Sequence, residues 1–416
     1  MRRYYKRLRY KVLRFYYRIV FRNEYFPPGR HKNREPAKDE RTTYTVMGET
    51  DLKGHFLLSF IFSRNLLVLD GKGRTIWSKY EPQPQKDFRT GFWDFKRHDF
   101  PDGTYLYSYH DFTGTYDSYR TEGYFPGERV LLTPDFEEID RLTIIGTEKI
   151  EDKHPLDSHD FLFIEKNHYI QMAYRKTWTK QVPNEERGCY VLAAYIQEVR
   201  NGIVIWEWDS SDYVEFYNIM FPAEDVDAWK SGVIDYLHLN SMLLGENGEL
   251  LLSFRNLSSI VCIDRTGDGG ILWQLSGRGD QFKLPYQYQL SAQHDLTWDD
   301  KGRLLVFNNG VSMGNSAITA YHLDIPNKQV KSVQIYAIPG YLSVAAGSGS
   351  HIVDDIYIFG WGKSKYHDEA MSVVDFGTGE TLLSIIPSDS RNISYRAFYA
   401  PPEVNTSLGN KDEDSI

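Results

Sequence analysis

Residues 66–80, LLVLDGKGRTIWSKY, contain one complete hairpin pattern: an apolar run, a turn of Asp and Gly, and a second run that includes Trp77. Short apolar runs bounded by such turns are typical of β-strands that pair with each other. The pattern returns along the chain at residues 130–144, 190–208, 260–277, 318–336 and 371–386. The copies follow one another at intervals of roughly 60 residues, a spacing typical of propeller blades or solenoid turns.

A second type of hairpin lies between these copies. It occurs at residues 54–65, 97–111, 158–176, 237–256, 293–310 and 350–363. Two hairpins in each repeat give four antiparallel strands, which is the content of one propeller blade. The sequence therefore predicts an all-β fold, a six-bladed β-propeller over residues 46–400, in which the second hairpin type supplies the strands nearest the axis.

Five of the six inner hairpins carry a histidine near the predicted start of the inner strand. These are His98, His159, His238, His294 and His351. A single histidine there is usually a half-buried residue, but equivalent positions in a ring of blades converge on the axis. Several buried imidazoles without partners would cost about 1–3 kcal/mol each. Arg255 follows the returning strand of the hairpin at 237–256, and Arg175 has a similar place in the hairpin at 158–176. We therefore expect a polar site around the central channel.

An aspartate follows three of these histidines, at Asp99, Asp160 and Asp295. Aspartate is common at turns in any case. Neighbouring side chains on a strand point to opposite faces. We therefore expect each carboxylate to bond the backbone or to orient a histidine of an adjacent blade, and not its own neighbour.

The residue types favour one chemistry over two others. A zinc site takes three or four His, Cys or carboxylate ligands, but Arg255 would repel the dication. Glycoside cleavage needs paired carboxylates about 5–9 Å apart, and the inner strands contain few acidic residues. Transfer of an anionic group needs an arginine to hold its oxygens and neutral imidazoles that act near pH 7. The sequence favours this third chemistry, with no metal and no cofactor.

The sequence also resembles the PAPS-independent arylsulfate sulfotransferases (the arylsulfotransferase, or ASST, family) over most of residues 50–400. The resemblance is most specific in three segments: SHDFLFIEKNHYI (158–170), LHLNSMLLGENGELLLSFRN (237–256) and QHDLTWDDKGRLLVFNNG (293–310). It implies a six-bladed propeller that moves a sulfuryl group from a phenolic sulfate ester to a phenol acceptor, without a nucleotide.

The resemblance also implies roles for individual residues. The family's catalytic histidines and arginine correspond to His159, His238, Arg255 and His294. His294 matches the nucleophile, which is transiently sulfated in a ping-pong reaction, while Arg255 would hold the sulfuryl oxygens. His159 or His238 would assist the departing phenolate. His98 remains an alternative to His159, because RHDF at 97–100 nearly repeats SHDF at 158–161.

Two alternatives from other functional classes stay open. One is a non-catalytic propeller that binds an anionic glycan or a protein partner, and the other is a metal-dependent lyase or hydrolase. The formal net charge of −9 argues against nucleic acid as a partner. Cys189 and Cys262 are too few for a disulfide framework, so they are either two buried free thiols or a single bridge.

The two ends of the chain differ from the repeats. Residues 1–45 are expected to form a basic helix and a linker, and Arg and Lys recur every three or four positions within residues 1–22. This spacing indicates an amphipathic helix on an anionic membrane surface, or else a frayed basic tail. Residues 401–416 are polar and acidic and are expected to be disordered.

The sequence does not decide in which compartment the protein works. No stretch reaches the roughly 20 apolar residues that span a bilayer. The sequence shows no recognisable signal peptide and little room for a large extra N-terminal domain, whereas well-known members of the family it resembles are exported. Cytoplasmic, membrane-surface and cell-envelope locations therefore all stay open.

Overall fold

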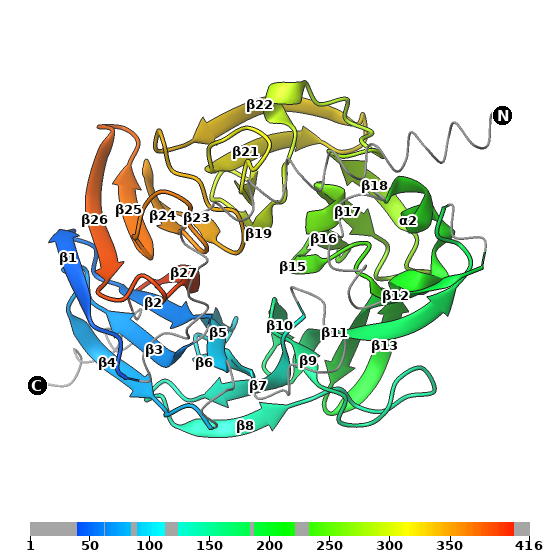
Figure 1. Ribbon diagram of the computed structural model, residues 1–416, viewed down its shortest axis with the longest axis horizontal. Helices are drawn as coiled ribbons and strands as arrows, with labels where there is room; N and C mark the ends of the chain where they lie inside the picture. Colours follow the sequence, from blue (N-terminus) through cyan, green and yellow to red (C-terminus); the bar gives the residue numbers. More distant parts are fainter. Residues whose placement is uncertain are drawn as a thin grey trace, which may run out of the picture.

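The computed structural model describes residues 40–61, 63–84, 90–112, 124–183, 187–220 and 233–402. Within these ranges the chain forms six sheets arranged radially around a central axis (Figure 1), and all their strand pairs are antiparallel except the short parallel pair of β12 with β14. The predicted six-bladed β-propeller is therefore confirmed. The predicted helix in residues 1–22 lies outside the described residues, as does all but the beginning of the tail at 401–416.

Each blade is named here with its strands in order from the axis outward (Figure 1). Blade 1 contains β27 (Ser394–Ala400), β2 (His55–Phe60), β3 (Ser63–Leu69) and β4 (Thr75–Tyr80). Blade 2 contains β5 (Gly91–Asp99), β6 (Tyr105–Phe112), β7 (Pro126–Leu132) and β8 (Glu138–Leu142), with β9 (Leu156–Asp157) paired to β7. Blade 3 contains β10 (Phe161–Glu165), β11 (His168–Thr179), β12 (Cys189–Arg200) and β13 (Ile203–Asp209), with β14 (Val233–Ile234) paired to β12.

The other three blades follow the same plan. Blade 4 contains β15 (Leu239–Leu244), β16 (Leu250–Phe254), β17 (Ser259–Ile263) and β18 (Ile271–Leu275). Blade 5 contains β19 (His294–Trp298), β20 (Leu304–Asn308), β21 (Ala317–Asp324) and β22 (Gln329–Tyr336). Blade 6 contains β23 (Ser348–Val353), β24 (Ile356–Gly360), β25 (Met371–Asp375), β26 (Glu380–Pro387) and β1 (Tyr44–Gly48). The described helical turns are η1 (Ser210–Asp212), α2 (Val214–Ile219), η2 (Arg255–Leu257) and η3 (Tyr286–Tyr288).

The two ends of the propeller domain close the ring. Strand β27, the last strand that the structure describes, is the innermost strand of blade 1, and β1 is the outermost strand of blade 6. The prediction that residues 54–65 form an inner hairpin is therefore wrong, because β2 is the second strand of its blade. The closing strand covers an edge of β2 that would otherwise be unpaired. This pairing joins residues more than 300 positions apart, as in the partnership of Leu57 with Phe398.

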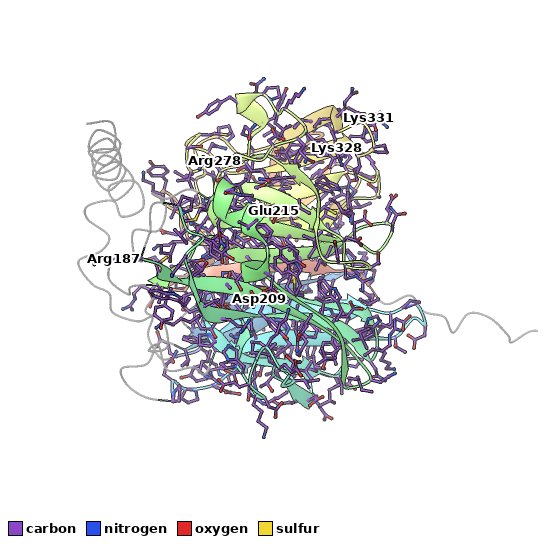
Figure 2. All side chains as sticks on the ribbon, turned by 90° about the vertical axis from the view of Figure 1, so that its right-hand side faces the viewer. Arg187, Asp209, Glu215, Arg278, Lys328 and Lys331 are labelled. Atoms are coloured by element: carbon purple, nitrogen blue, oxygen red, sulfur yellow. The ribbon has the colours of Figure 1, made fainter. Side chains whose placement is uncertain are left out.

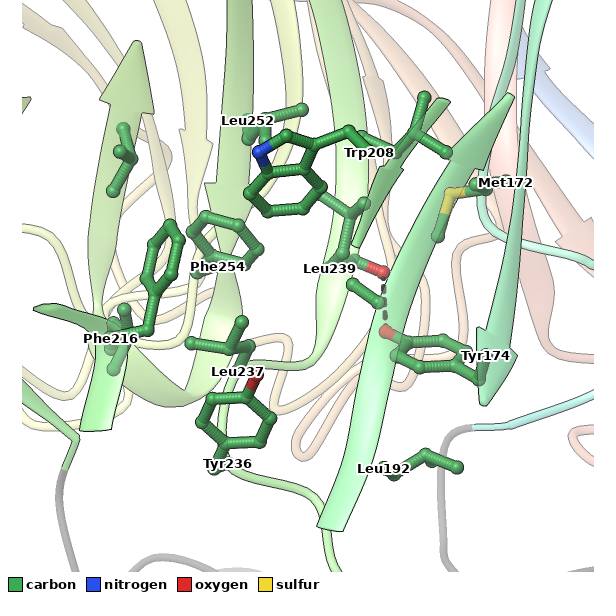
Figure 3. Packing of buried hydrophobic residues seen from close by; sticks show 14 of the residues in the cluster. Met172, Tyr174, Leu192, Trp208, Phe216, Tyr236, Leu237, Leu239, Leu252 and Phe254 are labelled. Carbon is green, nitrogen blue, oxygen red and sulfur yellow. Dashed lines mark hydrogen bonds between the residues drawn. The ribbon is translucent and has the colours of Figure 1, made fainter. Parts of the chain in front are cut away.

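Apolar side chains fill the spaces between the blades. Between blades 3 and 4, the side chains of Trp208, Phe254 and Leu239 meet in one buried cluster (Figure 3). The hydroxyl of Tyr174 in blade 3 donates to the backbone carbonyl of Leu239 in blade 4 at 2.8 Å, so a polar bond also crosses this interface. Strands such as β16 are buried on both faces, which explains why their sequences are continuously apolar and do not alternate.

The structure decides the state of the two cysteines. Cys189 and Cys262 are both free thiols, and burial raises the pKa of the Cys262 thiol to about 12. In the part of the chain that the structure describes, no helix has the length and apolar character needed to cross a membrane.

Candidate functional site

Three histidines lie at the start of neighbouring inner strands. His159 lies two residues before β10, His238 directly precedes β15, and His294 is the first residue of β19. All three are almost fully buried, with 3%, 7% and 2% of their surface exposed. The ring centroids of His159 and His238 are 5.1 Å apart. Because blades 3, 4 and 5 adjoin one another, these side chains meet at one end of the channel.

Arg255 reaches the same place from the second strand of blade 4. It follows β16, begins η2, and donates its backbone N–H to the carbonyl of His238 at 3.0 Å. Its guanidinium Nη2 donates to the carbonyl of Val344 at 3.4 Å, and its charge contributes to the lowered pKa of His294. The structure thus brings together His159, His238, Arg255 and His294, which we call the histidine cluster.

The backbone under the cluster is irregular. The pairing register shifts at the start of both β15 and β19. His238 and Asp295 have φ angles of +56° and +50°, in the left-handed region. Non-glycine residues in sparsely populated backbone regions cost roughly 1–3 kcal/mol each and concentrate at functional sites. A β-bulge interrupts the regular alternation of side chains and re-aims them, so this backbone turns polar groups toward the axis.

Carboxylates orient two of the three histidines. Nδ1 of His159 lies 2.5 Å from Oδ1 of Asp157, and Nδ1 of His238 lies 2.6 Å from Oδ2 of Asp235. Each aspartate also accepts the backbone N–H of its histidine at 3.0 Å. In both rings the carboxylate occupies Nδ1, which leaves Nε2 as the nitrogen to meet a substrate. Sequence reasoning missed both aspartates, although each precedes its histidine by only two or three residues.

An amide, and not a carboxylate, orients His294. Its Nδ1 lies 2.7 Å from Oδ1 of Asn309 and 3.1 Å from the carbonyl of Ala292. The Asn309 amide nitrogen donates to the carbonyls of Ser343 and Ala346 at 3.1 and 2.9 Å, which fixes the direction of its oxygen. Because both neighbours of Nδ1 are acceptors, Nδ1 carries the proton. Nε2 is then unprotonated, and it accepts the backbone N–H of Ala346 at 3.2 Å.

Burial controls the charge of these groups. It is the largest cause that lowers the pKa of His238 and of His294 well below 6.5, and the charge of Arg255 contributes at both residues. Both imidazoles are therefore neutral near pH 7. Burial also raises the pKa of the Asp235 carboxyl to about 7, so the Asp235–His238 pair gains or loses one proton near neutral pH.

Blades 1 and 2 place aromatic rings beside the cluster. The ring of Trp93, near the start of β5, lies 6.3 Å from the ring of His159, and the ring of Tyr395, near the start of β27, lies 6.0 Å from it. The two aromatic rings are 4.6 Å apart, and the Tyr395 hydroxyl donates to the carbonyl of His159 at 3.1 Å. The cluster is therefore polar on one side and aromatic on the other. Sequence reasoning did not single out either residue, since aromatic residues occur in most strands.

The structure separates His98 from the cluster. His98 is the eighth of the nine residues of β5 and lies near the opposite end of its strand from Trp93. Its Nε2 bonds the hydroxyl of Ser108 at 2.7 Å, and its ring lies 5.0 Å from the ring of Phe163. The prediction that His98 is near the start of an inner strand is therefore wrong. The structure places His159, and not His98, beside His238.

His351 and Arg175 also lie elsewhere. His351 is the fourth of the six residues of β23, and its Nε2 bonds the carbonyl of Asp354 at 2.8 Å, at the turn that leaves the strand. Arg175 forms an ion pair with Asp209 between β11 and β13. Figure 2, which views the ring from the side, shows Asp209 on the flank of the molecule. These two residues belong to the framework of blades 6 and 3.

The aspartates that follow the histidines join neighbouring blades. Asp160 accepts the backbone N–H of Met242 in blade 4 at 2.8 Å, and Asp295 accepts that of Gly349 in blade 6 at 3.1 Å. The expectation that these carboxylates bond the backbone is confirmed for both. Asp99 instead bonds the side chain of Arg97 on its own strand. None of these three carboxylates makes a hydrogen bond to a described histidine ring.

No three His, Cys, Asp or Glu side chains within the described ranges are grouped so that they could hold a metal ion.

One protein family matches the sequence. Its description is Arylsulfotransferase (ASST), and the match covers residues 117–384. No curated protein is similar to the chain at a significant level.

Many solved structures resemble the fold at low identity. A protein of unknown function from Bacteroides caccae has 11% identity and a TM-score of 0.42, with 83% of this chain and 98% of that chain covered. The periplasmic gluconolactonase of Pseudomonas aeruginosa has 11% identity and a TM-score of 0.42, with 86% and 100% covered. Virginiamycin B lyase from Staphylococcus aureus has 11% identity and a TM-score of 0.35, with 88% and 90% covered. Similarities this weak carry no information about activity.

Proposed function

Because the chain belongs to the arylsulfotransferase (ASST) family, we propose that it transfers a sulfuryl group from a phenolic sulfate ester to a phenol through an intermediate on His294. The observation that carries this proposal is the contrast among the three imidazoles. His294 is neutral, bonded by an amide, and presents an unprotonated Nε2 beside the cation of Arg255. His159 and His238 are each backed by a carboxylate.

The first half-reaction forms a nitrogen–sulfur bond. The Nε2 lone pair of His294 gives up the N–H of Ala346 and attacks sulfur, the bond from sulfur to the aryl oxygen breaks, and the phenolate leaves with the electron pair. The imidazole becomes positively charged while its Nδ1–H continues to donate to Asn309. Arg255 supplies a fixed positive charge for the sulfuryl oxygens in the transition state. Preorganised charge of this kind is usually the largest single contribution to catalysis in such transfers.

A proton donor is needed for the departing phenolate. A phenol has a pKa near 10, as in tyrosine, so its anion leaves poorly at pH 7. The Asp235–His238 pair holds an exchangeable proton near neutral pH, and His159 has a matching carboxylate in Asp157. Proton transfer from either imidazole would contribute roughly 10²–10⁴-fold to the rate. In the second half-reaction the acceptor phenol loses its proton to the same group and its oxygen attacks sulfur, which restores neutral His294.

The aromatic side of the cluster supports an aryl substrate. Trp93 and Tyr395 border His159, and the ring of Phe125 lies 4.4 Å from that of Trp93. Offset or edge-to-face contact with a substrate ring would add about 0.5–1.5 kcal/mol per pair beyond area burial. A scaffold that only held an anion would have no need for an unprotonated Nε2 next to the bound group.

The direct test is transfer without any added cofactor. The full chain is incubated with para-nitrophenyl sulfate and a phenol acceptor, and both nitrophenol and the sulfated acceptor are measured. We expect release of nitrophenol that depends on the acceptor. With donor alone, we expect one sulfuryl group per protein, found on the peptide that contains His294. Absence of transfer, or transfer that requires an added nucleotide or metal ion, would contradict the proposal.

A further inference from the structure

One buried guanidinium contacts residues of four other blades. Arg396 is the third residue of β27, the closing strand, and only 2% of its surface is exposed. Its Nη1 lies 3.0 Å from Oδ1 of Asp94 and 3.7 Å from Oδ1 of both Asp160 and Asp295. Its Nη2 donates to the backbone carbonyl of Asn240 at 2.7 Å. These partners belong to blades 2, 3, 5 and 4 in that order.

Three of the four partners lie one or two residues after a histidine of the cluster. The pairs are His159 with Asp160, His238 with Asn240, and His294 with Asp295. The fourth partner, Asp94, directly follows Trp93 on the aromatic side. The guanidinium therefore contacts the chain next to every imidazole of the cluster, by a hydrogen bond at Asn240 and by ion pairs at Asp160 and Asp295, without itself being one of the groups proposed to meet the substrate.

The guanidinium is part of a buried network of three cations and three carboxylates. Its members are Lys96, Arg129, Arg396, Asp94, Asp160 and Asp295. Lys96 bridges Asp94 and Asp160 at 3.0 and 2.5 Å, and Arg129 lies 2.5 Å from Asp94. Burying charges is costly even when they are paired, so such networks are weak evidence for stability. Fixing one geometry is the better-attested use of buried polar groups.

We propose that Arg396 is a positioning residue for sulfuryl transfer. It holds β10, β15 and β19 at the distances that let the three imidazoles of the histidine cluster face one reacting sulfur atom. This inference rests on the proposed function. Because Arg396 is on the closing strand, the cluster reaches its working geometry only when β27 has closed the ring. A displacement of about 1 Å in such a site costs around 10²-fold in rate.

The test compares Arg396→Lys with a matched control, Arg303→Lys. Arg303 is also buried, with 6% exposed, and it pairs with Asp299 at 2.6 Å and bonds the hydroxyls of Tyr336 and Tyr357. It directly precedes β20, at the end of blade 5 opposite His294. Lysine keeps the charge at both positions but loses the forked geometry of the guanidinium. Both variants should therefore lose similar thermal stability.

The expected difference is in kcat. We expect Arg396→Lys to lower kcat with para-nitrophenyl sulfate by roughly 30- to 100-fold, with a much smaller change in KM because Arg255 is untouched. Arg303→Lys should leave both constants nearly unchanged. An Arg396→Lys protein with the kcat of the control would overturn the inference. So would a loss that falls on KM alone, because that pattern would indicate binding and not position.

A second measurement does not depend on turnover. In protein with nitrogen-labelled histidine, NMR reports the protonated Nδ1 and unprotonated Nε2 of His294. We expect Arg396→Lys to change these signals and Arg303→Lys to leave them as in the wild type. If the wild-type protein has no transferase activity but Arg396→Lys still changes the His294 signals, the proposed function is wrong, while Arg396 does position the histidine. Unchanged signals and kcat in an active protein would remove the positioning role alone.

A milder variant covers the case in which Arg396→Lys does not fold. Asp295→Asn keeps the oxygen that accepts the Gly349 N–H but removes the carboxylate that faces Arg396. It should slow sulfation of His294 by roughly tenfold in a single turnover, since it removes only the ion pair between Arg396 and β19. An unaltered sulfation rate in a folded Asp295→Asn protein would contradict the proposal.

Discussion

Blades 2 and 3 carry nearly the same four residues, Arg97–Phe100 and Ser158–Phe161, at opposite ends of their inner strands. In blade 3 the histidine precedes β10, and its ring meets the ring of His238 at 5.1 Å. In blade 2 the histidine is the last but one residue of β5, and its Nε2 bonds Ser108. The same local motif therefore yields one member of a buried cluster and one residue of the framework.

The difference teaches that the position of such a motif along its strand, at the start or at the end, decides what its histidine does. The position in blade 2 that lies beside His159 is occupied by Trp93, and Asp94 follows it as Asp160 follows His159. Asp94 has a φ of +48°, and the β5 register shifts there, so the same bulged start is present with a different side chain. Blade 2 therefore has the same irregular backbone at the start of its inner strand, with the indole of Trp93 in the place of an imidazole.

The largest effect is expected when the nucleophile is removed. His294→Ala should lower transfer by a factor on the order of 10⁴ or more, and the protein should form no sulfated intermediate with donor alone. His98→Ala, which removes the histidine of the framework motif, should keep the transfer rate. The measurement is nitrophenol release together with mass spectrometry of the sulfated peptide. An active His294→Ala protein, or label on another residue, would break the assignment.

Loss of the arginine should come next. Arg255→Ala keeps Nε2 of His294 but removes the charge for the sulfuryl oxygens. We expect a loss of about 2–4 kcal/mol of transition-state stabilisation, which is about 30- to 1,000-fold in kcat/KM. Arg175→Ala is the control, since Arg175 pairs with Asp209 on the flank. Equal kcat/KM for the two variants would show that Arg255 does not touch the reacting group.

The comparison between blades 2 and 3 is tested most directly by their histidines. His159→Gln should slow transfer by about 10²-fold when the donor releases a phenol of pKa near 10. It should matter far less for para-nitrophenyl sulfate, because an acidic phenol leaves without a proton. His98→Gln should show no dependence on the leaving group. The measurement is the transfer rate of both variants with a series of donors, plotted against the pKa of the departing phenol. Equal slopes for His159→Gln and His98→Gln would refute a proton-transfer role for His159.

The smallest effect concerns the partner of His238. The Asp235–His238 pair holds its extra proton below about pH 7 and loses it as the pH rises through that value, because burial raises the pKa of Asp235 to about 7. Transfer from donors with poor leaving groups should therefore decline above pH 7. Asp235→Asn replaces the titrating group by the kind of amide that orients His294. We expect about a tenfold lower rate below pH 7 and no inflection there.

The Asp157→Asn variant is the matched comparison for the inflection expected near pH 7. If the inflection persists in Asp235→Asn and disappears in Asp157→Asn, then His159 and its aspartate carry the proton. If neither substitution moves the pH profile, the departing phenolate receives no proton from these imidazoles. Rate against pH with para-nitrophenyl sulfate and with a donor of a less acidic phenol separates these results.

The sequence alone determined the number of blades and placed His159, His238 and His294 at the starts of inner strands, but it also placed His98 there, which is wrong. Hairpin patterns and their repeat are local properties, so the spacing of segments such as residues 66–80 and 260–277 was sufficient for the six-bladed propeller. The same spacing placed His238 and Arg255 at the ends of two adjoining strands, which the pairing of β15 with β16 confirms.

Only the tertiary structure decided which groups complete the cluster. The closing strand β27 brings Arg396 to Asp94 across 302 positions of the chain, and Asn309 reaches His294 from the end of the paired strand β20, held there by carbonyls of Ser343 and Ala346. The motifs at residues 97–100 and 158–161 also look alike until it is known which one ends its inner strand and which one precedes it. The physical reason is that convergence on the axis depends on how six sheets pack around it. A local pattern predicts the strands of each sheet, but it does not predict which residues of other blades contact that sheet once the ring has closed.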